Sequence, residues 1–86
     1  MTIEIKILTA PGCTTCDQAK AMVQKVVEQS GRDFPEMSYR TIDVAESPEI
    51  GVRYGVLSTP AIIINDILAF RGVPKEKALR EKLELL

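Results

Sequence analysis

The chain has 86 residues, with 11 basic and 12 acidic side chains and a formal net charge of −1 at pH 7. A chain of this length forms one compact domain, which buries about 60 to 65% of the surface that its unfolded form exposes. The basic residues are scattered, so the electrostatic pattern of a nucleic-acid-binding protein is missing. Histidine is absent, which excludes Cys–His catalytic pairs and histidine-containing zinc sites within one chain.

We expect no targeting segment at the N-terminus. Met1 and Thr2 lead directly into alternating apolar and polar residues, without the basic and apolar leader of a signal peptide. The apolar run at 61–64 is too short to span a bilayer, which needs roughly 20 apolar residues. We therefore expect a soluble cytoplasmic protein that binds neither membranes nor nucleic acid.

The N-terminal part of the chain predicts one strand followed by one helix. Isoleucines alternate with polar residues over positions 3–7, which is the period of a half-buried strand, and Pro11-Gly12 ends this pattern. A helix is expected to begin near Cys13 and to end at Gly31. One stripe of this helix is expected to face the core and consists of Ala19, Val23, Val26, Val27 and Ser30.

The middle of the chain predicts a second strand and a short helix. Met37–Val44 mixes aromatic, β-branched and polar side chains in an extended pattern, which favours a strand. Ser47-Pro48-Glu49 then provides an N-cap, a first-turn proline and an acidic residue. This combination predicts a short helix that ends near Gly55.

The C-terminal part predicts a hairpin and a last helix. Ala61–Ile64 and Ile67–Phe70 flank Asn65-Asp66, whose residue types tolerate the left-handed geometry of tight hairpins. Gly72 closes the hairpin, and Pro74 is expected in the first turn of the helix. The apolar stripe of that helix consists of Ala78, Leu79, Leu83 and Leu86.

The predicted order of elements is strand, helix, strand, helix, strand, strand, helix. No repeat, linker or low-complexity segment interrupts the sequence. The order implies a single α/β domain over residues 1–86, with a mixed four-stranded sheet and helices on its faces.

The two cysteines, Cys13 and Cys16, form one CxxC motif at the predicted start of the first helix. Two cysteines at this spacing on a helical turn have Cα atoms roughly 5 Å apart, within the range of a disulfide. Unpartnered N–H groups and the helix dipole favour a thiolate at Cys13, whose pKa we expect to be depressed. Cys16 leads the apolar stripe and should be more buried. We therefore expect a dithiol/disulfide oxidoreductase in which Cys13 attacks a partner disulfide and Cys16 resolves the mixed disulfide.

Two other functions stay open for this motif. Zinc or an iron–sulfur cluster would need ligands from two chains, because one chain offers two cysteines and no histidine. A redox-sensing or interaction protein would keep the fold and the motif without turning over a substrate. Thr14 and Thr15 could donate hydroxyl or amide hydrogen bonds toward the Cys13 sulfur. Asp17 and Lys20 are expected to be solvated surface residues outside the site.

Two segments, Ile3–Lys20 and Val56–Gly72, resemble the thioredoxin-fold redox proteins, especially the small glutaredoxin-like thioredoxins of archaea and some bacteria. The resemblance depends on Cys13-Thr14-Thr15-Cys16, on Ser58-Thr59-Pro60 and on the order of elements, which matches the minimal form of that fold. It implies a redox-active CxxC on a thioredoxin-like, glutaredoxin-type α/β fold.

The resemblance also implies which residues meet the partner. Pro60 would be cis and would face the cysteines, and Thr59 would offer its backbone groups to an extended partner segment. Small residues beside the sulfur would let the partner backbone approach. The residues expected to bind the substrate are Gly12, Thr14, Thr15, Thr59, Pro60 and Gly72.

The chain departs from both kinds of relative. Ordinary thioredoxins have an aromatic residue before the first cysteine and a buried acid on the preceding strand, where this chain has Gly12 and Ile7. Glutaredoxins that use glutathione have a tyrosine or phenylalanine inside the motif and a Gly-Gly followed by Thr-Asp, where this chain has Thr14-Thr15 and Gly72-Val73-Pro74. We therefore expect protein disulfides as substrates and a protein reductase of the thioredoxin-reductase type, rather than glutathione, as reductant. We expect a monomer without a cofactor or metal.

Overall fold

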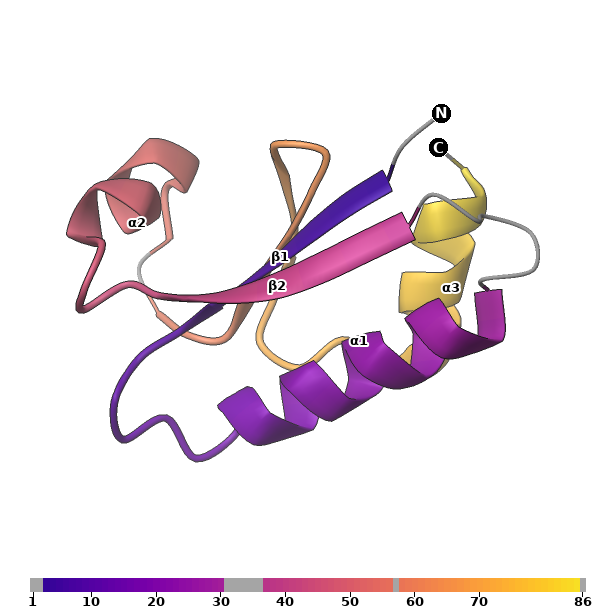
Figure 1. The fold of residues 1–86 in the computed structure, drawn as a ribbon, viewed down its shortest axis with the longest axis horizontal. Helices are drawn as coiled ribbons and strands as arrows, with labels where there is room; N and C mark the ends of the chain where they lie inside the picture. The colour runs from indigo at the N-terminus through magenta and orange to yellow at the C-terminus, as the bar shows by residue number, and fades with distance from the viewer. Residues whose placement is uncertain (1–2, 31–36, 57, 86) are drawn as a thin grey trace.

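The computed structural model describes residues 3–30, 37–56 and 58–85 (Figure 1). The order of elements confirms the predicted fold class. No helix in the described part of the chain is long and apolar enough to cross a membrane. The elements are β1 (Ile3–Thr9), α1 (Cys16–Ser30), β2 (Met37–Asp43), α2 (Pro48–Tyr54), β3 (Ala61–Ile64), β4 (Ile67–Arg71) and α3 (Glu76–Glu84).

The strands form one mixed sheet with the order β2-β1-β3-β4. β1 pairs in parallel with β2, and the crossover between them contains α1, as parallel neighbours require. β1 pairs in antiparallel fashion with β3, which in turn pairs with β4. β1 is therefore a central strand, and its C-terminal end leads into the loop that carries the cysteines.

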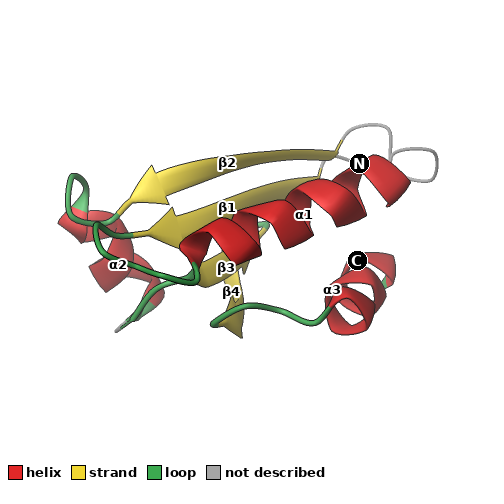
Figure 2. Cartoon of the chain, turned by 90° about the horizontal axis from the view of Figure 1, so that it is seen from below, coloured by secondary structure: helices red, strands yellow, loops and turns green. Residues whose placement is uncertain are grey.

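One face of the sheet is covered by α1 and α3 (Figure 2). The alternating isoleucines of β1 are at most 1% exposed, as their spacing predicted. Full burial of a side chain of this size stabilises the folded state by about 1.5–3 kcal/mol. This face holds the larger of the two apolar cores. The core consists of Ile3, Ile5, Ile7, Ala19, Val23, Val26, Ile62, Ile64, Leu79 and Leu83.

The opposite face has a smaller apolar core under α2. Leu8, Ala61 and Ile63 are fully buried there. Ile50 and Tyr54 of α2 pack against them, together with side chains from β2, from β4 and from the segment after α2. The side chains of Lys6 and Leu8 lie on the same side of β1, because side chains alternate along a strand.

Lys6 lies in a polar network on this second face. Its Nζ donates to the Tyr54 hydroxyl and to Asp66 Oδ1, both over 3.2 Å, and the Tyr54 hydroxyl donates to Asp66 Oδ1 over 2.7 Å. The hydrogen bond with Tyr54, followed by that with Asp66, raises the pKa of Lys6 above its ordinary value. The Tyr54 hydroxyl and then the Lys6 ammonium lower the pKa of Asp66. This Lys6 network joins β1, α2 and the tip of the hairpin.

The hairpin between β3 and β4 has the predicted tight turn. Asn65 has φ 50° and Asp66 has φ 66°, so both residues adopt the left-handed conformation that Asn and Asp tolerate. The Asn65 N–H donates to the Glu4 carbonyl, and Asn65 Oδ1 accepts from the Glu4 N–H, each over 2.9 Å. The turn is thereby fixed to the start of β1.

α1 begins later than the sequence predicted, at Cys16 rather than near Cys13. The cause is a turn at Pro11-Gly12, which is closed by a hydrogen bond from the Cys13 N–H to the Ala10 carbonyl. The Cys13 backbone therefore belongs to the end of the turn and not to the first turn of the helix.

α3 also begins later than predicted, at Glu76, so Pro74 precedes the helix instead of occupying its first turn. A fixed proline φ fits an extended backbone as well as a helical one. Here Lys75 is extended, with φ −77° and ψ 143°, and its carbonyl accepts the helical hydrogen bond from the Leu79 N–H. Pro74 is buried ahead of the helix.

Smaller differences concern the ends of β2 and α2. β2 ends at Asp43 rather than at Val44. Ser47 occupies the predicted N-cap position of α2 but makes no side-chain cap hydrogen bond, and Gly55 ends this helix with φ 68°, as expected. Three predicted positions lie outside the described residues: the helix end at Gly31, the Ser30 side chain and Leu86.

Candidate redox site

A tight turn places Cys13 at the end of β1. Pro11 and Gly12 occupy its centre, Gly12 has φ 77°, and the Cys13 N–H donates to the Ala10 carbonyl over 3.2 Å. These are the features of a type II turn, in which proline is favoured at the second position and glycine at the third. A Cβ atom on Gly12 would meet nothing within 4 Å. The backbone conformation therefore requires this glycine, and the space beside it is open.

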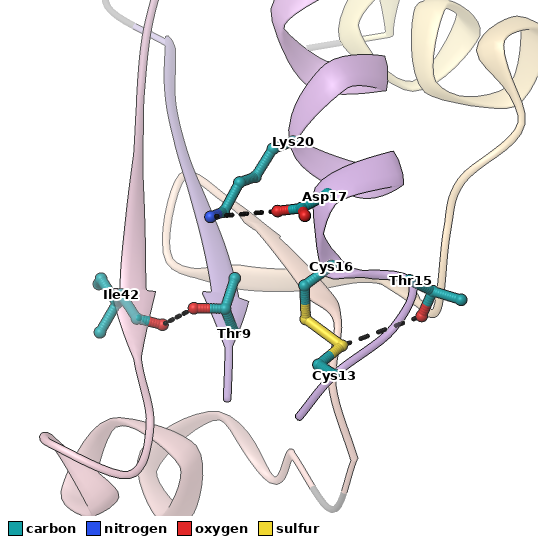
Figure 3. Close-up of a disulfide and its surroundings, with 7 residues drawn as sticks. All are labelled: Thr9, Cys13, Thr15, Cys16, Asp17, Lys20 and Ile42. Atoms are coloured by element: carbon teal, nitrogen blue, oxygen red, sulfur yellow. Dashed lines mark hydrogen bonds and ion pairs between the residues drawn. A yellow bond between two sulfur atoms is a disulfide. The ribbon is translucent and has the colours of Figure 1, made fainter. Parts of the chain in front are cut away.

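Cys13 and Cys16 form a disulfide between this turn and the first residue of α1 (Figure 3). Their Cα atoms are 5.6 Å apart, within the range that a disulfide accepts and close to the predicted separation. Cys16 is only 4% exposed and leads the buried stripe of α1, whereas Cys13 is partly buried. A partner can therefore reach the Cys13 sulfur more readily than the Cys16 sulfur.

The start of α1 provides a positive potential beside the disulfide. The Ala19 N–H donates to the Thr15 carbonyl over 3.1 Å, and this is where helical hydrogen bonding begins. The first N–H groups of a helix have no helical acceptor, and the helix dipole adds partial positive charge at this end. The Cys13 sulfur is bonded to the sulfur of Cys16, the first residue of α1, so it lies close to this positive end of the helix.

Asp17 and Lys20 pair with each other near the disulfide, with 3.7 Å between Lys20 Nζ and Asp17 Oδ1 (Figure 3). The Asp17 side chain is 94% exposed, so water and salt screen its charge. Both residues were expected to be surface residues outside the site. Asp17 is exposed, as expected, whereas Lys20 is half-buried, and Asp17 has a cationic partner of its own.

Thr14 and Thr15 differ in their relation to the disulfide. Thr15 Oγ1 is 3.9 Å from Cys13 Sγ, within hydrogen-bonding range of a sulfur atom (Figure 3). Thr14 is exposed and makes no side-chain hydrogen bond to another described residue. The structure thus brings Thr15, and not Thr14, to the Cys13 sulfur.

The peptide bond between Thr59 and Pro60 is cis, as the family resemblance implied. Pro60 is buried directly before β3, and its carbonyl accepts a hydrogen bond from the Gly72 N–H over 2.8 Å. Gly72 has φ 85°, a conformation that glycine adopts without strain. No backbone hydrogen bond joins Thr59 to another described residue.

Strand register brings these loops to the same end of the sheet. Leu8 lies opposite Ala61, and Ala61 lies opposite Arg71. The cysteine loop after β1, Pro60 before β3 and the segment after β4 therefore leave the sheet together. That segment begins with Gly72 and includes Val73, which is 37% exposed and was not predicted as a site residue. The sequence feature that could have indicated Val73 is its position between Gly72 and Pro74.

Ile7 occupies the place where ordinary thioredoxins have a buried acid. It is fully buried and lies opposite Ile62 on β3 and Thr41 on β2. No Asp or Glu among the residues that the structure describes is buried. The described residues therefore offer Cys16 no buried carboxylate as a proton acceptor.

The fold and the disulfide together define a class of protein. A thioredoxin-like α/β fold with a redox-active CxxC at the end of its central strand is a thiol–disulfide oxidoreductase. The family model described as the thioredoxin domain matches residues 3–84. The chain belongs to the thioredoxin family.

Curated relatives agree with this assignment. The thioredoxin of Methanocaldococcus jannaschii is 34% identical over 82 residues, which cover 95% of this chain and 93% of that protein. A probable thioredoxin of Methanothermobacter thermautotrophicus is 30% identical over 84 residues, which cover 96% of this chain and 94% of that protein. The match therefore extends over almost the full length of these proteins.

Solved structures show the same fold at lower sequence identity. A thioredoxin-2 described as a component of the malaria parasite protein secretion machinery has a TM-score of 0.80 at 16% identity, with 99% of this chain and 84% of that chain covered. A thioredoxin variant from Halobacterium salinarum has a TM-score of 0.77 at 22% identity, with 96% and 73% covered. These likenesses support the fold.

The relatives favour disulfide exchange over the metal-binding alternative. They are named as thioredoxins or probable thioredoxins. The chain is therefore a dithiol/disulfide oxidoreductase of the thioredoxin family.

Proposed function

We propose that this protein reduces protein disulfides with Cys13 as the attacking thiol and Cys16 as the resolving thiol. The observation that carries these roles is the difference in burial, since Cys16 is 4% exposed and Cys13 is partly buried at the end of a turn. The start of α1 adds to this difference because it favours a thiolate at Cys13. The partner must therefore meet Cys13 first.

The proposed cycle consists of two exchange steps. The Cys13 thiolate attacks one sulfur of the partner disulfide, so that a Cys13–partner disulfide forms and the other partner sulfur leaves as a thiolate. The Cys16 thiolate then attacks Cys13 Sγ, which forms the Cys13–Cys16 disulfide and releases the second partner thiolate. Two electrons pass from the protein to the partner, and the protons of the two cysteines balance those that the partner thiolates take up.

The partner segment is proposed to bind beside Cys13 in an extended form. Thr59 makes no backbone hydrogen bond to a described residue, so its N–H and C=O suit a short ladder with an extended chain. Gly12 and Gly72 both have positive φ, and a Cβ at either position would meet nothing within 4 Å. This open space lets a backbone approach at either glycine, and the exposed Val73 offers it an apolar contact. Thr14 is exposed in the same loop as Cys13.

A protein reductase of the thioredoxin-reductase type is proposed to recycle the disulfide, rather than glutathione. The support comes from Thr14-Thr15 and Gly72-Val73-Pro74, which replace the residues typical of glutathione-dependent glutaredoxins. The test supplies the oxidised protein either with a thioredoxin reductase and its reduced nicotinamide cofactor or with glutathione and glutathione reductase. Faster recycling by the first system is expected, and faster recycling by glutathione would contradict the proposal.

The protein is proposed to act as a cytoplasmic monomer. Its exposed large apolar side chains are scattered over different elements, as Tyr39 on β2, Val52 on α2 and Ile67 on β4 illustrate. Scattered apolar residues are normal on a monomer, whereas a stable interface needs a contiguous patch. The chain has no further cysteines for the structural disulfides that are common in small secreted domains, which favours a reducing compartment. Sedimentation equilibrium tests the first statement, and cell fractionation tests the second.

A trapping experiment tests the roles of the two cysteines. Reduced Cys16→Ser protein is mixed with insulin as a disulfide-containing partner, and mixed disulfides are identified by mass spectrometry. We expect a stable Cys13–insulin disulfide, because the resolving thiol is missing. Cys13→Ser is the matched control and should trap nothing, because Cys16 is buried. Trapping by Cys13→Ser but not by Cys16→Ser would reverse the assignment.

A further inference from the structure

The Thr15 hydroxyl has one hydrogen-bond partner among the described residues, and that partner is the Cys13 sulfur. The distance from Oγ1 to Sγ is 3.9 Å (Figure 3). A disulfide sulfur has no hydrogen to donate, so the hydroxyl must be the donor in this contact. The backbone of Thr15 is fixed as well, because its carbonyl accepts from the Ala19 N–H at the start of α1.

This direction of the hydroxyl is unusual for a residue that precedes a helix. A threonine at an N-cap ordinarily accepts a hydrogen bond from an N–H group two or three residues later. No such bond from Asp17 or Gln18 to Thr15 Oγ1 is found in the described part of the chain. The side chain therefore points its hydrogen toward the sulfur instead of capping α1.

We propose that Thr15 is a positioning residue for the chemistry of Cys13, whose thiolate it stabilises through its hydroxyl. This inference builds on the proposed role of Cys13 as the attacking thiol. Hydrogen bonds to an ionised acceptor are shorter and about twice as strong as those to a neutral acceptor. The contact therefore strengthens when the disulfide is reduced and the charge appears on Cys13.

Two consequences follow from this difference between the oxidised and reduced states. The pKa of the Cys13 thiol falls, because the hydroxyl favours its charged form. The midpoint potential of the Cys13–Cys16 couple rises, because the reduced protein gains more than the disulfide. The hydrogen bond is made to the Cys13 sulfur, so it makes the two thiols unequal before any partner binds.

Thr14 provides a matched control within the same motif. It is the same residue type, adjacent in sequence and also between the two cysteines, but it is exposed and makes no side-chain hydrogen bond to a described sulfur atom. If threonine acted generally on the loop backbone, substitutions at both positions would change the properties of Cys13. If the Thr15 hydroxyl acts, only substitution of Thr15 changes them.

The experiment compares Thr15→Val, Thr15→Ser and Thr14→Val. Iodoacetamide alkylation of Cys13 in the Cys16→Ser background, measured against pH, gives the ionisation midpoint of the thiol. Equilibration with glutathione buffers gives the midpoint potential of the two-cysteine protein. Neither measurement uses a partner protein.

We expect Thr15→Val to raise the ionisation midpoint by about one pH unit, since a hydrogen bond to a charged group exceeds one to a neutral group by roughly that much. One pH unit corresponds to a tenfold change in the equilibrium constant. At a pH above the ionisation midpoint, a tenfold change lowers the midpoint potential of this two-electron couple by about 30 mV. Thr15→Ser should restore both values because it keeps the hydroxyl. Thr14→Val should change each equilibrium by less than about twofold.

The proposal is overturned if Thr15→Val changes neither value, if Thr14→Val shifts them equally, or if Thr15→Ser behaves like Thr15→Val. Thr15→Ala replaces Thr15→Val if the valine variant does not fold, with the same expected shifts. If Thr15→Val shows the expected shifts but insulin trapping fails, the proposed function is refuted and the role of Thr15 is kept. If trapping succeeds but Thr15→Val shows no shift, the role of Thr15 is refuted and the proposed function is kept.

Discussion

The two faces of the sheet hold their helices by different means. Under α1 and α3, buried apolar side chains from β1 and β3 pack against both helices. Under α2, the apolar core is smaller, and the Lys6 network supplies further contacts between β1, α2 and the hairpin. The helix that carries Cys16 therefore lies on the deeper apolar core, whereas a shorter helix precedes the loop with Thr59 and Pro60.

This difference separates the two halves of the redox site by their sensitivity to solution conditions. Burial of apolar surface does not depend on protonation, whereas contacts between ionised groups weaken with salt and with titration. The cysteine side of the site should therefore stay fixed over a wide pH range. The loop with Pro60 comes after α2 in the chain, and charged groups of the Lys6 network hold part of α2. We therefore expect this loop to lose its position first at extreme pH.

The largest expected effect lies on the apolar face. Ile5→Ala removes a fully buried side chain of β1 and should lower the free energy of unfolding by about 2–5 kcal/mol, because a cavity remains. Urea unfolding followed by circular dichroism measures it. Val52→Ala on α2 is the control, since Val52 is 83% exposed and its truncation should cost no more than about 0.5 kcal/mol. Equal losses in the two variants would contradict the assignment of the core.

A smaller effect is expected for the Lys6 network. Tyr54→Phe removes the hydroxyl that accepts from Lys6 and donates to Asp66, which should cost about 1 kcal/mol in the free energy of unfolding. Tyr39→Phe is the matched control, because the Tyr39 hydroxyl makes no hydrogen bond to another described residue. NMR titration of Asp66 in Tyr54→Phe should show its pKa returning toward 3.8, since Tyr54 is the main cause of its depression. No change in stability or in this pKa would show that the network does not hold α2.

The smallest effect is the pH dependence that this network adds to stability. The folded-state pKa of Asp66 is below 3.8, so its contribution is present above that pH and is lost as the pH falls through the folded-state value. The folded-state pKa of Lys6 is above 10.5, so its contribution is present below that pH and is lost as the pH rises through the folded-state value. Asp66→Asn keeps a residue that tolerates positive φ, and its stability difference from the natural protein should shrink as the pH falls below about 3.8. A difference that grows there would refute this prediction.

Periodicity and turn chemistry were enough to predict most of the fold. Alternation along β1 identified its buried isoleucines, and Asn65-Asp66 identified the hairpin because few residues adopt left-handed geometry. The starts of α1 and α3 were wrong because Pro11-Gly12 and Pro74 fit more than one local backbone. Tertiary hydrogen bonds and burial decide between those alternatives, and a single sequence does not contain them.

The sequence was enough to predict the two reactive cysteines of the site, but not the side chains that surround them. The spacing of Cys13 and Cys16 predicted the disulfide, and the family resemblance implied the cis peptide at Pro60. Spacing alone could not distinguish Thr14 from Thr15, because the difference depends on the exact course of the loop. The Lys6 network was also invisible in the sequence, since its members lie 48 and 60 residues from Lys6 along the chain.

The buried Ile7 has a kinetic consequence for turnover. With no buried carboxylate among the described residues, the proton that Cys16 loses before its attack passes to water, to a solvent-exposed base or to the departing thiolate. The resolving step should therefore accelerate with buffer concentration at constant pH and ionic strength, and should slow in heavy water. A thioredoxin with an internal base would keep this step independent of the medium, whereas here its speed is set partly by the composition of the surrounding solution.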